Sequence, residues 1–319
     1  MLRFLLRRIL FGSLVIWIVA TVIFILYFVT PHDPARLIAG KNATAQSIID
    51  VKRRLGLDRP ILDQYGRYLW RLIHGDLGYS YFSQQPVTSI IKRELPVTAS
   101  VTLGGAILWI LIGISSGVLA ATHPRSFADR TVTGFALFFY SMPTFLLGEL
   151  LLLGLIGEAY KIGFKFFPPG YYVGISQDPY QWFVHMILPW FTVALVTAAT
   201  YTRLTRGSML EVMGEDYIRT ARAKGLRERR VVYRHGLRSA LTPVTTQFGI
   251  DIGTLLGGVI VTETVFSLNG LGEQIYNSIS RQDLPVIMGI ATLASVFIVI
   301  ANIAVDAVYA VLDPRVRLS

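Results

Sequence analysis

Hydrophobic residues gather in long runs along the chain, separated by shorter polar segments. A helix needs roughly 20 mostly apolar residues to cross a bilayer, because an unpaired backbone group is costly in hydrocarbon. Six runs have about this length, and Pro189 in the fourth is tolerated where neighbouring helices satisfy the freed carbonyl. We therefore expect an all-α polytopic membrane protein with six transmembrane helices, at 9–29, 97–121, 131–156, 184–201, 244–266 and 285–312.

Composition agrees with this pattern. Of the 319 residues, 53% are hydrophobic and 16% are charged, and the mean hydropathy is +0.52. A water-soluble surface hardly accommodates that balance. The chain has no cysteine, which excludes disulfides, thiolate metal sites and a cysteine nucleophile. A net charge of +10 would suggest nucleic acid in a soluble chain, but in a membrane protein loop charges report orientation, and we expect no nucleic-acid partner.

Basic residues are concentrated on one side of the predicted spans. Residues 203–238 hold ten Lys and Arg against four Asp and Glu, whereas 267–284 holds one Arg against two acidic residues. Because short cytoplasmic loops carry an excess of Lys and Arg, we expect 203–238 and both termini in the cytoplasm. The first apolar run is too long for a signal peptide and no small-residue cleavage site precedes Pro31, so we expect a retained helix.

Residues 30–96 form an insertion of helical pattern after the first predicted span. Thr44 caps one segment, and a second segment begins at Pro60 and ends at Gly75. We expect two or three short extracytoplasmic helices, which form either a packed cap or a docking surface. The expected domains are 1–29, 30–96, a five-helix core at 97–312 that includes a cytoplasmic loop at 203–243, and a cytoplasmic C-terminus at 313–319.

A polar, basic stretch at 215–243 separates the fourth and fifth predicted spans. Two acidic residues at its start suit the positive end of a helix dipole, and Gly225 suits the end of that helix. A second helix at 226–241 carries five arginines, and Pro243 then opens the fifth span. The stretch predicts a helical hairpin on the cytoplasmic side.

One face of this hairpin carries small residues. Tyr217, Ala221 and Gly225 are spaced by four residues and therefore share a face of the first helix. Such a face, framed by arginines, suits insertion into a groove on another protein. Charge alone favours an ordinary positive-inside loop resting on anionic lipid. The glycine between two helices and the small-residue face favour the protein partner.

Charges inside the predicted spans are costly and therefore mark candidate functional positions. Asp251 is the strongest candidate, because it lies beside Gly249, Gly253 and Gly257, which repeat every four residues and permit close helix approach. These four residues are candidates for a translocation path or for an interface with a second subunit. Packing within the chain explains the glycines equally well.

Other residues in the predicted spans are weaker candidates. Met142 and Pro143 in the third span are candidates for the wall of a passage, although an apolar residue beside a proline kink is also ordinary packing. Glu149, Glu263 and Asp306 are further charges at membrane depth. The histidines are scattered without a pair at ligand spacing, so we expect no metal site.

The stretch RTARAKG, at 219–225, resembles the EAA loop of the membrane subunits of bacterial ABC importers. Ala221 and Gly225 hold the pattern, whereas Arg219, Thr220 and Arg238 depart from it. Other stretches along nearly the whole chain resemble the dipeptide/oligopeptide permease branch of the binding-protein-dependent transport family. They are LGLDRPILDQY (55–65), GDLGYS (75–80), GIDIGTLLGGVIVTETVF (249–266), GLGEQIYNSISRQDLPVIMG (270–289) and DPRVR (313–317).

The resemblance implies a permease of the type I importer fold in a bacterial cell membrane. Its implied partners are a second homologous permease, two ATPase subunits and an extracytoplasmic solute-binding protein. The ATPases would bind ATP and Mg, since this chain has no Gly-x-x-x-x-Gly-Lys-Ser/Thr phosphate loop, no cofactor of its own and no enzyme activity. The implied ATPase-coupling residues are Tyr217, Arg219, Thr220, Ala221, Lys224, Gly225 and Leu226.

The cargo implied by the resemblance is a dipeptide or an oligopeptide, and nickel chelates or glutathione fit the same architecture. An intramembrane enzyme is the alternative from another class. GISSG (113–117) matches Gly-x-Ser-x-Gly and SIIK (89–92) matches Ser-x-x-Lys. The first lies within a predicted helix rather than on a strand-to-helix turn, and the second lies in a soluble region, so both are weak signals.

Overall fold

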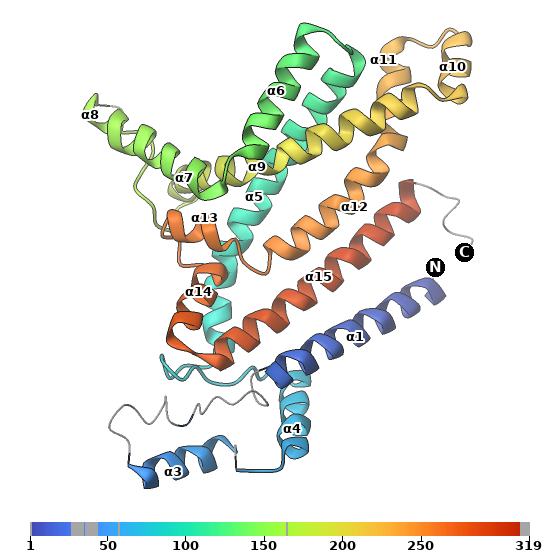
Figure 1. Cartoon of the computed structure of the whole chain (residues 1–319). Coiled ribbons are helices and arrows are strands. Elements are labelled where there is room, and N and C mark those ends of the chain that lie inside the picture. The colour runs from blue at the N-terminus through green and yellow to red at the C-terminus, as the bar shows by residue number, and fades with distance from the viewer. Residues whose placement is uncertain (1, 27–34, 36–43, 57, 164, 313–319) are drawn as a thin grey trace.

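The computed structural model describes residues 2–26, 35, 44–56, 58–163 and 165–312, and this part of the chain is predominantly helical (Figure 1). Four helices in this part of the chain are long and apolar enough to cross a membrane. The bent pair α6 (Phe127–Ser141) and Thr144–Lys161 makes a fifth crossing if it counts as one span. The expected all-α polytopic membrane fold is confirmed at this level. Residues 1, 27–34, 36–43, 57, 164 and 313–319 of the predicted domains lie outside the described residues. The four long helices are α1 (Leu2–Phe24), α5 (Val87–Thr122), α9 (Pro179–Met213) and α15 (Leu284–Leu312).

The third predicted span, at 131–156, is broken at its proline, and the break is much sharper than an ordinary proline kink. α6 ends at Ser141, and α7 (Thr144–Leu152) begins after Pro143 with a bend of 98°. Met142 between them is extended, with φ −89° and ψ 124°. A residue before proline is pushed out of the helical region by the proline ring, which explains the position of the break. A π-helical turn at Leu153–Glu158 then leads into α8 (Ala159–Lys161).

The fifth predicted span is also displaced from 244–266. α11 (Glu228–Arg230) and a π-helical turn at Val231–Gly236 run directly into α12 (Leu237–Leu255), which contains Pro243 in its interior. Pro243 therefore does not open the span as predicted. The helix ends instead before Gly258, whose φ of +138° is open to glycine and strained for other residues. α13 (Ile260–Val265) follows as a separate short helix.

The core of the molecule is the parallel pair α5 and α9, which make the most extensive contact between helices in the described residues. At three glycines of α5 an added β-carbon would collide with side chains of α9, so the two backbones approach closely. We call this line of close contacts the glycine seam. Trp109 and Tyr201 lie along it, and neither is exposed to solvent. The three facing pairs are Gly104 with Trp190, Gly113 with Tyr201 and Gly117 with Thr205.

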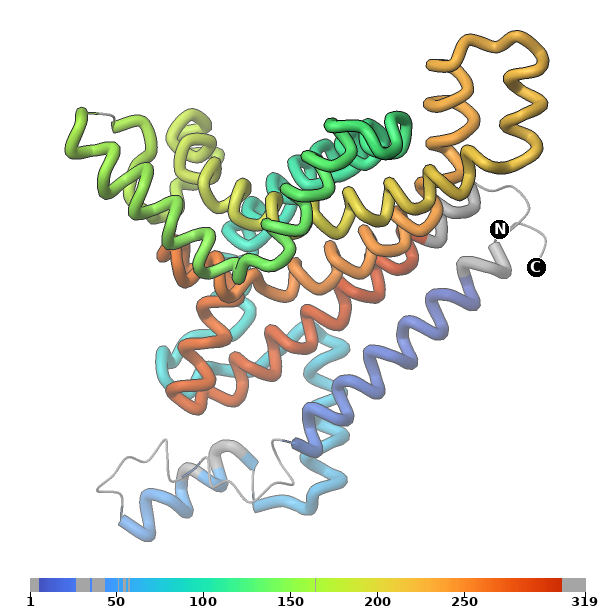
Figure 2. Tube along the Cα trace, turned by 45° about the horizontal axis from the view of Figure 1, so that its top comes forward, coloured from blue at the N-terminus to red at the C-terminus, as the bar shows by residue number. Residues whose placement is uncertain are grey.

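The two ends of the molecule are distinct (Figures 1 and 2). One end carries α10 (Asp216–Ala223) and α11, and α1 begins and α15 ends there. The other end carries α3 (Ala45–Leu55), α4 (Ile61–Ile73) and α14 (Leu271–Arg281). α3 and α4 are two short helices of the kind predicted for the insertion. α5 begins at Val87, before the predicted start at 97, and continues through Pro96.

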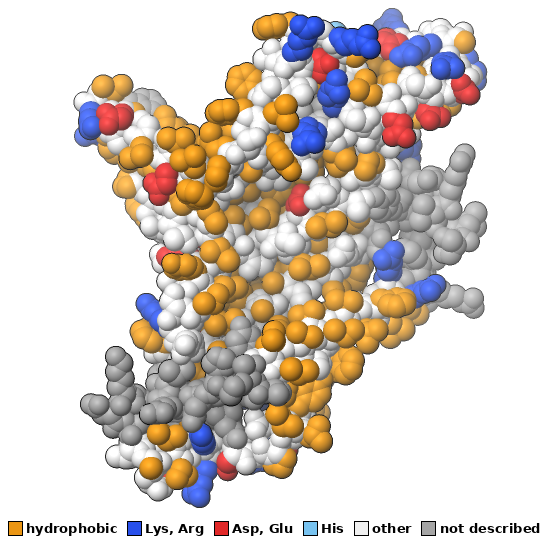
Figure 3. Space-filling model, viewed as in Figure 1, with side chains coloured by type: hydrophobic (Ala, Val, Ile, Leu, Met, Phe, Trp, Pro, Cys, Tyr) orange, Lys and Arg blue, Asp and Glu red, His pale blue; other side chains and the backbone are white. Residues whose placement is uncertain are grey.

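The surface reflects a membrane environment. Exposed apolar side chains cover α1, including Leu10, Phe11 and Trp17. Lys and Arg side chains gather over the end that carries α10 and the last turns of α9 (Figure 3). Apolar side chains on an outer helix are typical of contact with lipid.

Candidate functional site

α10, α11 and the turn between them form a hairpin, called the α10 hairpin below, which is held together by a small apolar cluster of its own. Ile218 and Ala221 lie one turn apart on α10 and pack against Val231, and all three are buried. Leu226 covers the same cluster from the turn that follows the helix. α10 is therefore fixed to the chain along one side rather than free on all sides.

The end of α10 is a complete glycine cap. Gly225 has φ +74°, its N–H donates to the carbonyl of Arg222 at 2.9 Å, and Leu226 N–H donates to the carbonyl of Ala221 at 3.4 Å. These two bonds, with Leu226 packed against the cluster that contains Ala221, form a Schellman motif. A β-carbon at Gly225 would meet nothing within 4 Å. Glycine is therefore needed for its backbone conformation and not for space.

An ion pair closes the turn between α10 and α11. The Arg222 guanidinium donates to both carboxylate oxygens of Glu228, at 2.8 and 3.1 Å. This bond lowers the pKa of Glu228 and raises the pKa of Arg222. Both side chains remain substantially exposed, so the pair positions the turn more than it stabilises the fold.

The exposed face of α10 differs from the predicted one. Ala221 is 7% exposed and faces its own chain, so the prediction that it lies on an insertion face with Tyr217 and Gly225 is wrong. Tyr217 is 44% exposed, and its hydroxyl donates to Ser239 Oγ at 3.1 Å. The reason is that Ile218 and Ala221, three residues apart, share the face of α10 that packs against Val231. The predicted coupling residues that are exposed are Tyr217, Arg219, Thr220, Lys224 and Gly225.

α9 is tied to α6 near the same end of the molecule. Arg206 donates to both carboxylate oxygens of Asp129, at 2.7 and 2.9 Å, and Asp129 is only 5% exposed. Arg203 lies over the ring of Tyr140, 5.1 Å from its centroid. The sequence carries no signal for this connection, because Asp129 and Arg206 are far apart along the chain.

Asp251 in α12 accepts a hydrogen bond from α9. Its carboxylate accepts hydrogen bonds from Tyr201 Oη at 2.8 Å and from Gln247 Nε2 at 2.9 Å. Each oxygen thus has a partner within the chain. The geometry favours a bond between helices and gives no separate support to a place on the translocation path.

The glycines around Asp251 pack against α15 of the same chain. β-carbons at Gly249, Gly253 and Gly257 would collide with Val305, Ile298 and Ala294, respectively. These contacts support the alternative of packing within the chain. A place for these glycines on a path or at a permease interface stays a prediction.

Met142 and Pro143 lie at the sharp bend between α6 and α7. Met142 is half-buried and Pro143 is exposed. Their role in a passage stays a prediction.

Glu263 joins the helices at the opposite end. It is fully buried, accepts a hydrogen bond from Thr98 Oγ1 at 2.6 Å and accepts another from Glu273 N–H at 3.0 Å. Leu271 N–H donates to Thr98 Oγ1 at 2.9 Å. The two side chains together cap the start of α14 and fix it to α5.

Comparison with known proteins decides the family. The profile described as "Binding-protein-dependent transport system inner membrane component" matches residues 110–318, and the profile of the N-terminal part of such membrane components matches residues 1–102. The chain belongs to this family of transport permeases. The predicted resemblance is confirmed, and the chain is a multi-pass inner-membrane permease subunit of an ABC transporter and not an ATPase.

Relatives match the permease over nearly its full length. A Brucella abortus protein named as a peptide transport system permease is 39% identical over 317 residues, which cover 99% of each chain. The glutathione transport system permease protein of Escherichia coli is 37% identical over 317 residues and also covers 99% of each chain. A Sinorhizobium fredii protein named as a peptide ABC transporter permease is 36% identical over 314 residues, which cover 98% of this chain and 99% of that protein.

A solved structure supports the fold. A chain of the methionine ABC transporter MetNI, in an inward-facing conformation, matches with a TM-score of 0.52 and 18% identity. The match covers 71% of this permease and 97% of that chain. At this identity the likeness concerns the fold alone.

Proposed function

We propose that this permease forms, with a second homologous permease, the translocation path of an ATP-driven importer of short peptides. The α10 hairpin is the observation that carries the proposal. It projects beyond the long helices, one side is fixed to the chain by Ile218 and Ala221, and its Arg219, Thr220 and Lys224 side chains are exposed (Figure 2). A helix anchored on one side and exposed on the other suits contact with a separate ATPase subunit.

We place α10 on the cytoplasmic side because residues 203–238 are strongly basic. α1 begins and α15 ends at that same end, which supports cytoplasmic termini. Six crossings of the type I importer fold follow if α12 completes a further span and α6 to α8 form one. The likeness to the MetNI chain supports this arrangement at the level of the fold.

ATP and Mg bind to the two ATPase subunits in this proposal, and closure of those subunits moves α10. α9 leads directly into α10 through Gly214, and Arg206 joins α9 to Asp129 of α6. Movement of α10 therefore reaches both α9 and the bent third span. The spans then alternate between inward-open and outward-open states, and an extracytoplasmic solute-binding protein delivers the cargo.

Short peptides are the cargo class that the relatives favour, since two of those described are named for peptide transport. Glutathione is itself a tripeptide, and the Escherichia coli relative is named for its transport at a similar identity. We therefore propose a dipeptide or oligopeptide importer, with glutathione as the second candidate.

Purification and reconstitution test the proposal. Tagged permease should co-purify with a second permease and with ATPase subunits, and the complex in liposomes should import a labelled dipeptide only with ATP and a solute-binding protein. Competition with unlabelled tripeptides and glutathione would rank the cargo. Purification of the permease without ATPase partners, or uptake that needs no ATP, would refute the proposed function.

A further inference from the structure

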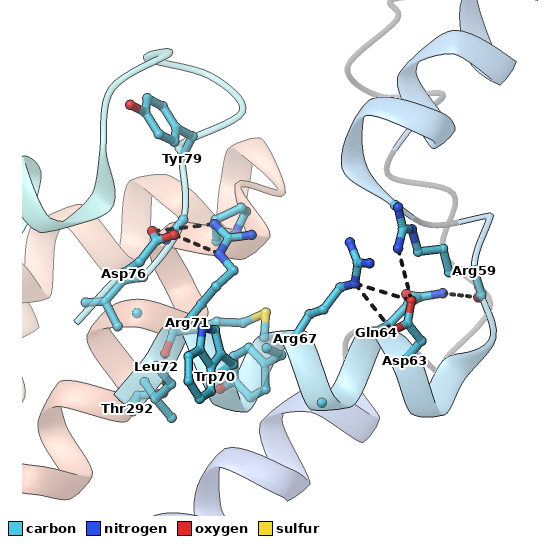
Figure 4. Close-up of a pocket in the computed structure, with 18 of the residues that line it drawn as sticks. Arg59, Asp63, Gln64, Arg67, Trp70, Arg71, Leu72, Asp76, Tyr79 and Thr292 are labelled. Atoms are coloured by element: carbon cyan, nitrogen blue, oxygen red, sulfur yellow. Dashed lines mark hydrogen bonds and ion pairs between the residues drawn. The ribbon is translucent and has the colours of Figure 1, made fainter. Parts of the chain in front are cut away.

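A cavity of about 970 Å³ opens at the end of the permease opposite to α10 (Figure 4). It lies between the exposed side of α4, the loop at 76–84 and the first turns of α15. Four arginines and two aspartates are the charged residues among its described walls, which leaves a surplus of two positive charges. The arginines are Arg53, Arg59, Arg67 and Arg71.

The ion pairs in the wall do not neutralise these arginines. Asp63 is shared between Arg59 and Arg67, each at 3.3 Å, whereas charge-assisted hydrogen bonds are ordinarily about 2.7–2.9 Å. The second carboxylate, Asp76, is held by Arg71 at 2.8 Å, and this bond lowers the pKa of Asp76. Arg67 lies between Asp63 and the Arg71–Asp76 pair, and its bond to Asp63 through Nε leaves guanidinium donors for another acceptor (Figure 4).

Apolar side chains accompany the charges. Trp70 is 66% exposed and Tyr79 is 60% exposed, and both line the cavity beside Leu62. Large aromatic side chains and arginines are the residue types that dominate binding energy at protein interfaces. The cavity therefore suits a polypeptide segment that presents carboxylates next to an apolar side chain.

We infer that this cavity receives an acidic surface segment of the solute-binding protein. The inference rests on the proposed function, which places this end outside the cell and makes transport depend on such a protein. The family description itself specifies dependence on a binding protein. Because Arg59, Arg67 and Arg71 are each about half exposed, their charges act mainly on association and on its salt dependence.

The test uses the reconstituted complex and titrates purified solute-binding protein while ATPase activity is measured. Arg67→Gln removes one guanidinium, and Arg67→Glu reverses its charge. Lys165→Glu is the control, since Lys165 is exposed and does not line the cavity. We expect the half-saturating concentration of binding protein to rise roughly two- to fivefold for Arg67→Gln and more for Arg67→Glu, with the maximal rate unchanged. Added salt should weaken the wild type more than either variant.

Each outcome decides a different question. An unchanged half-saturating concentration in both Arg67 variants, with binding-protein-dependent activity in the wild type, overturns the docking inference and leaves the proposed function in place. Loss of co-purifying anionic phospholipid without a change in half-saturation would assign the cavity to lipid and also overturn it. A wild-type complex that does not respond to binding protein refutes the proposed function and the inference together.

Discussion

Replacement of Gly225 by valine isolates the conformation of the α10 cap. The residue has φ +74°, and a new side chain would meet nothing within 4 Å, so the only cost is in the backbone. An L-residue in this left-handed region costs about 1–2 kcal/mol, and a β-branched residue lies at the upper end. That cost lowers the equilibrium constant for formation of the native turn by a factor of about 5–30.

If α10 couples the permease to an ATPase as proposed, we expect peptide uptake per ATP hydrolysed to fall by up to this factor, because the altered turn transmits movement less well. The assay measures labelled-peptide uptake and phosphate release in the same proteoliposomes. Gly225→Asn is the matched control, since asparagine adopts the left-handed conformation at lower cost. Equal coupling ratios for Gly225→Val and wild type, with equal amounts of complex, would refute the reasoning.

Three further predictions concern other parts of the permease. Asp129→Asn should lower the free energy of unfolding of the complex by about 1–3 kcal/mol. Adding Arg206→Gln should recover part of that loss in a double-mutant cycle, because it removes the arginine charge that Asp129→Asn leaves unpaired. Gly249→Val should lower the free energy of unfolding by about 1–3 kcal/mol or more, because the new side chain collides with α15. Gly207→Ala, at an open position, should leave that free energy unchanged or raise it slightly. The pKa of Glu228 is lowered, so its bond to Arg222 stabilises the turn above the unfolded pKa and is lost as pH falls through the folded pKa. The hydrogen-exchange protection of α10, corrected for the intrinsic exchange rate at each pH, should therefore fall on acidification, and a Glu228→Gln variant with the same pH response would contradict this.

The membrane class, four of the long helices and the glycine at the end of α10 could be predicted from local sequence. Run length and hydropathy depend only on neighbouring residues, and so does the glycine that ends a helix. The sharp break at Pro143 could not be separated from the uninterrupted helices through Pro96, Pro189 and Pro243, since all four prolines stand in apolar or helical surroundings. Tertiary packing decides which proline ends a helix.

The candidate site was predicted in part. Exposure of Arg219, Thr220 and Lys224 agrees with the sequence analysis. Burial of Ala221 depends on Val231, which lies across the turn, and the pairing of Asp129 with Arg206 joins residues from different helices. Contacts of this kind are set by the fold and leave no periodic signal in one sequence.

The glycine seam between α5 and α9 has a mechanical consequence. With Gly104, Gly113 and Gly117 closed against α9, the two helices have no room to slide or rotate past each other without a collision. α5 and α9 therefore move as a single rigid body, a stiff beam with α10 attached to one end. Any force applied to α10 displaces the beam as a whole, so that the compliance required for transport resides in the softer contacts that surround it.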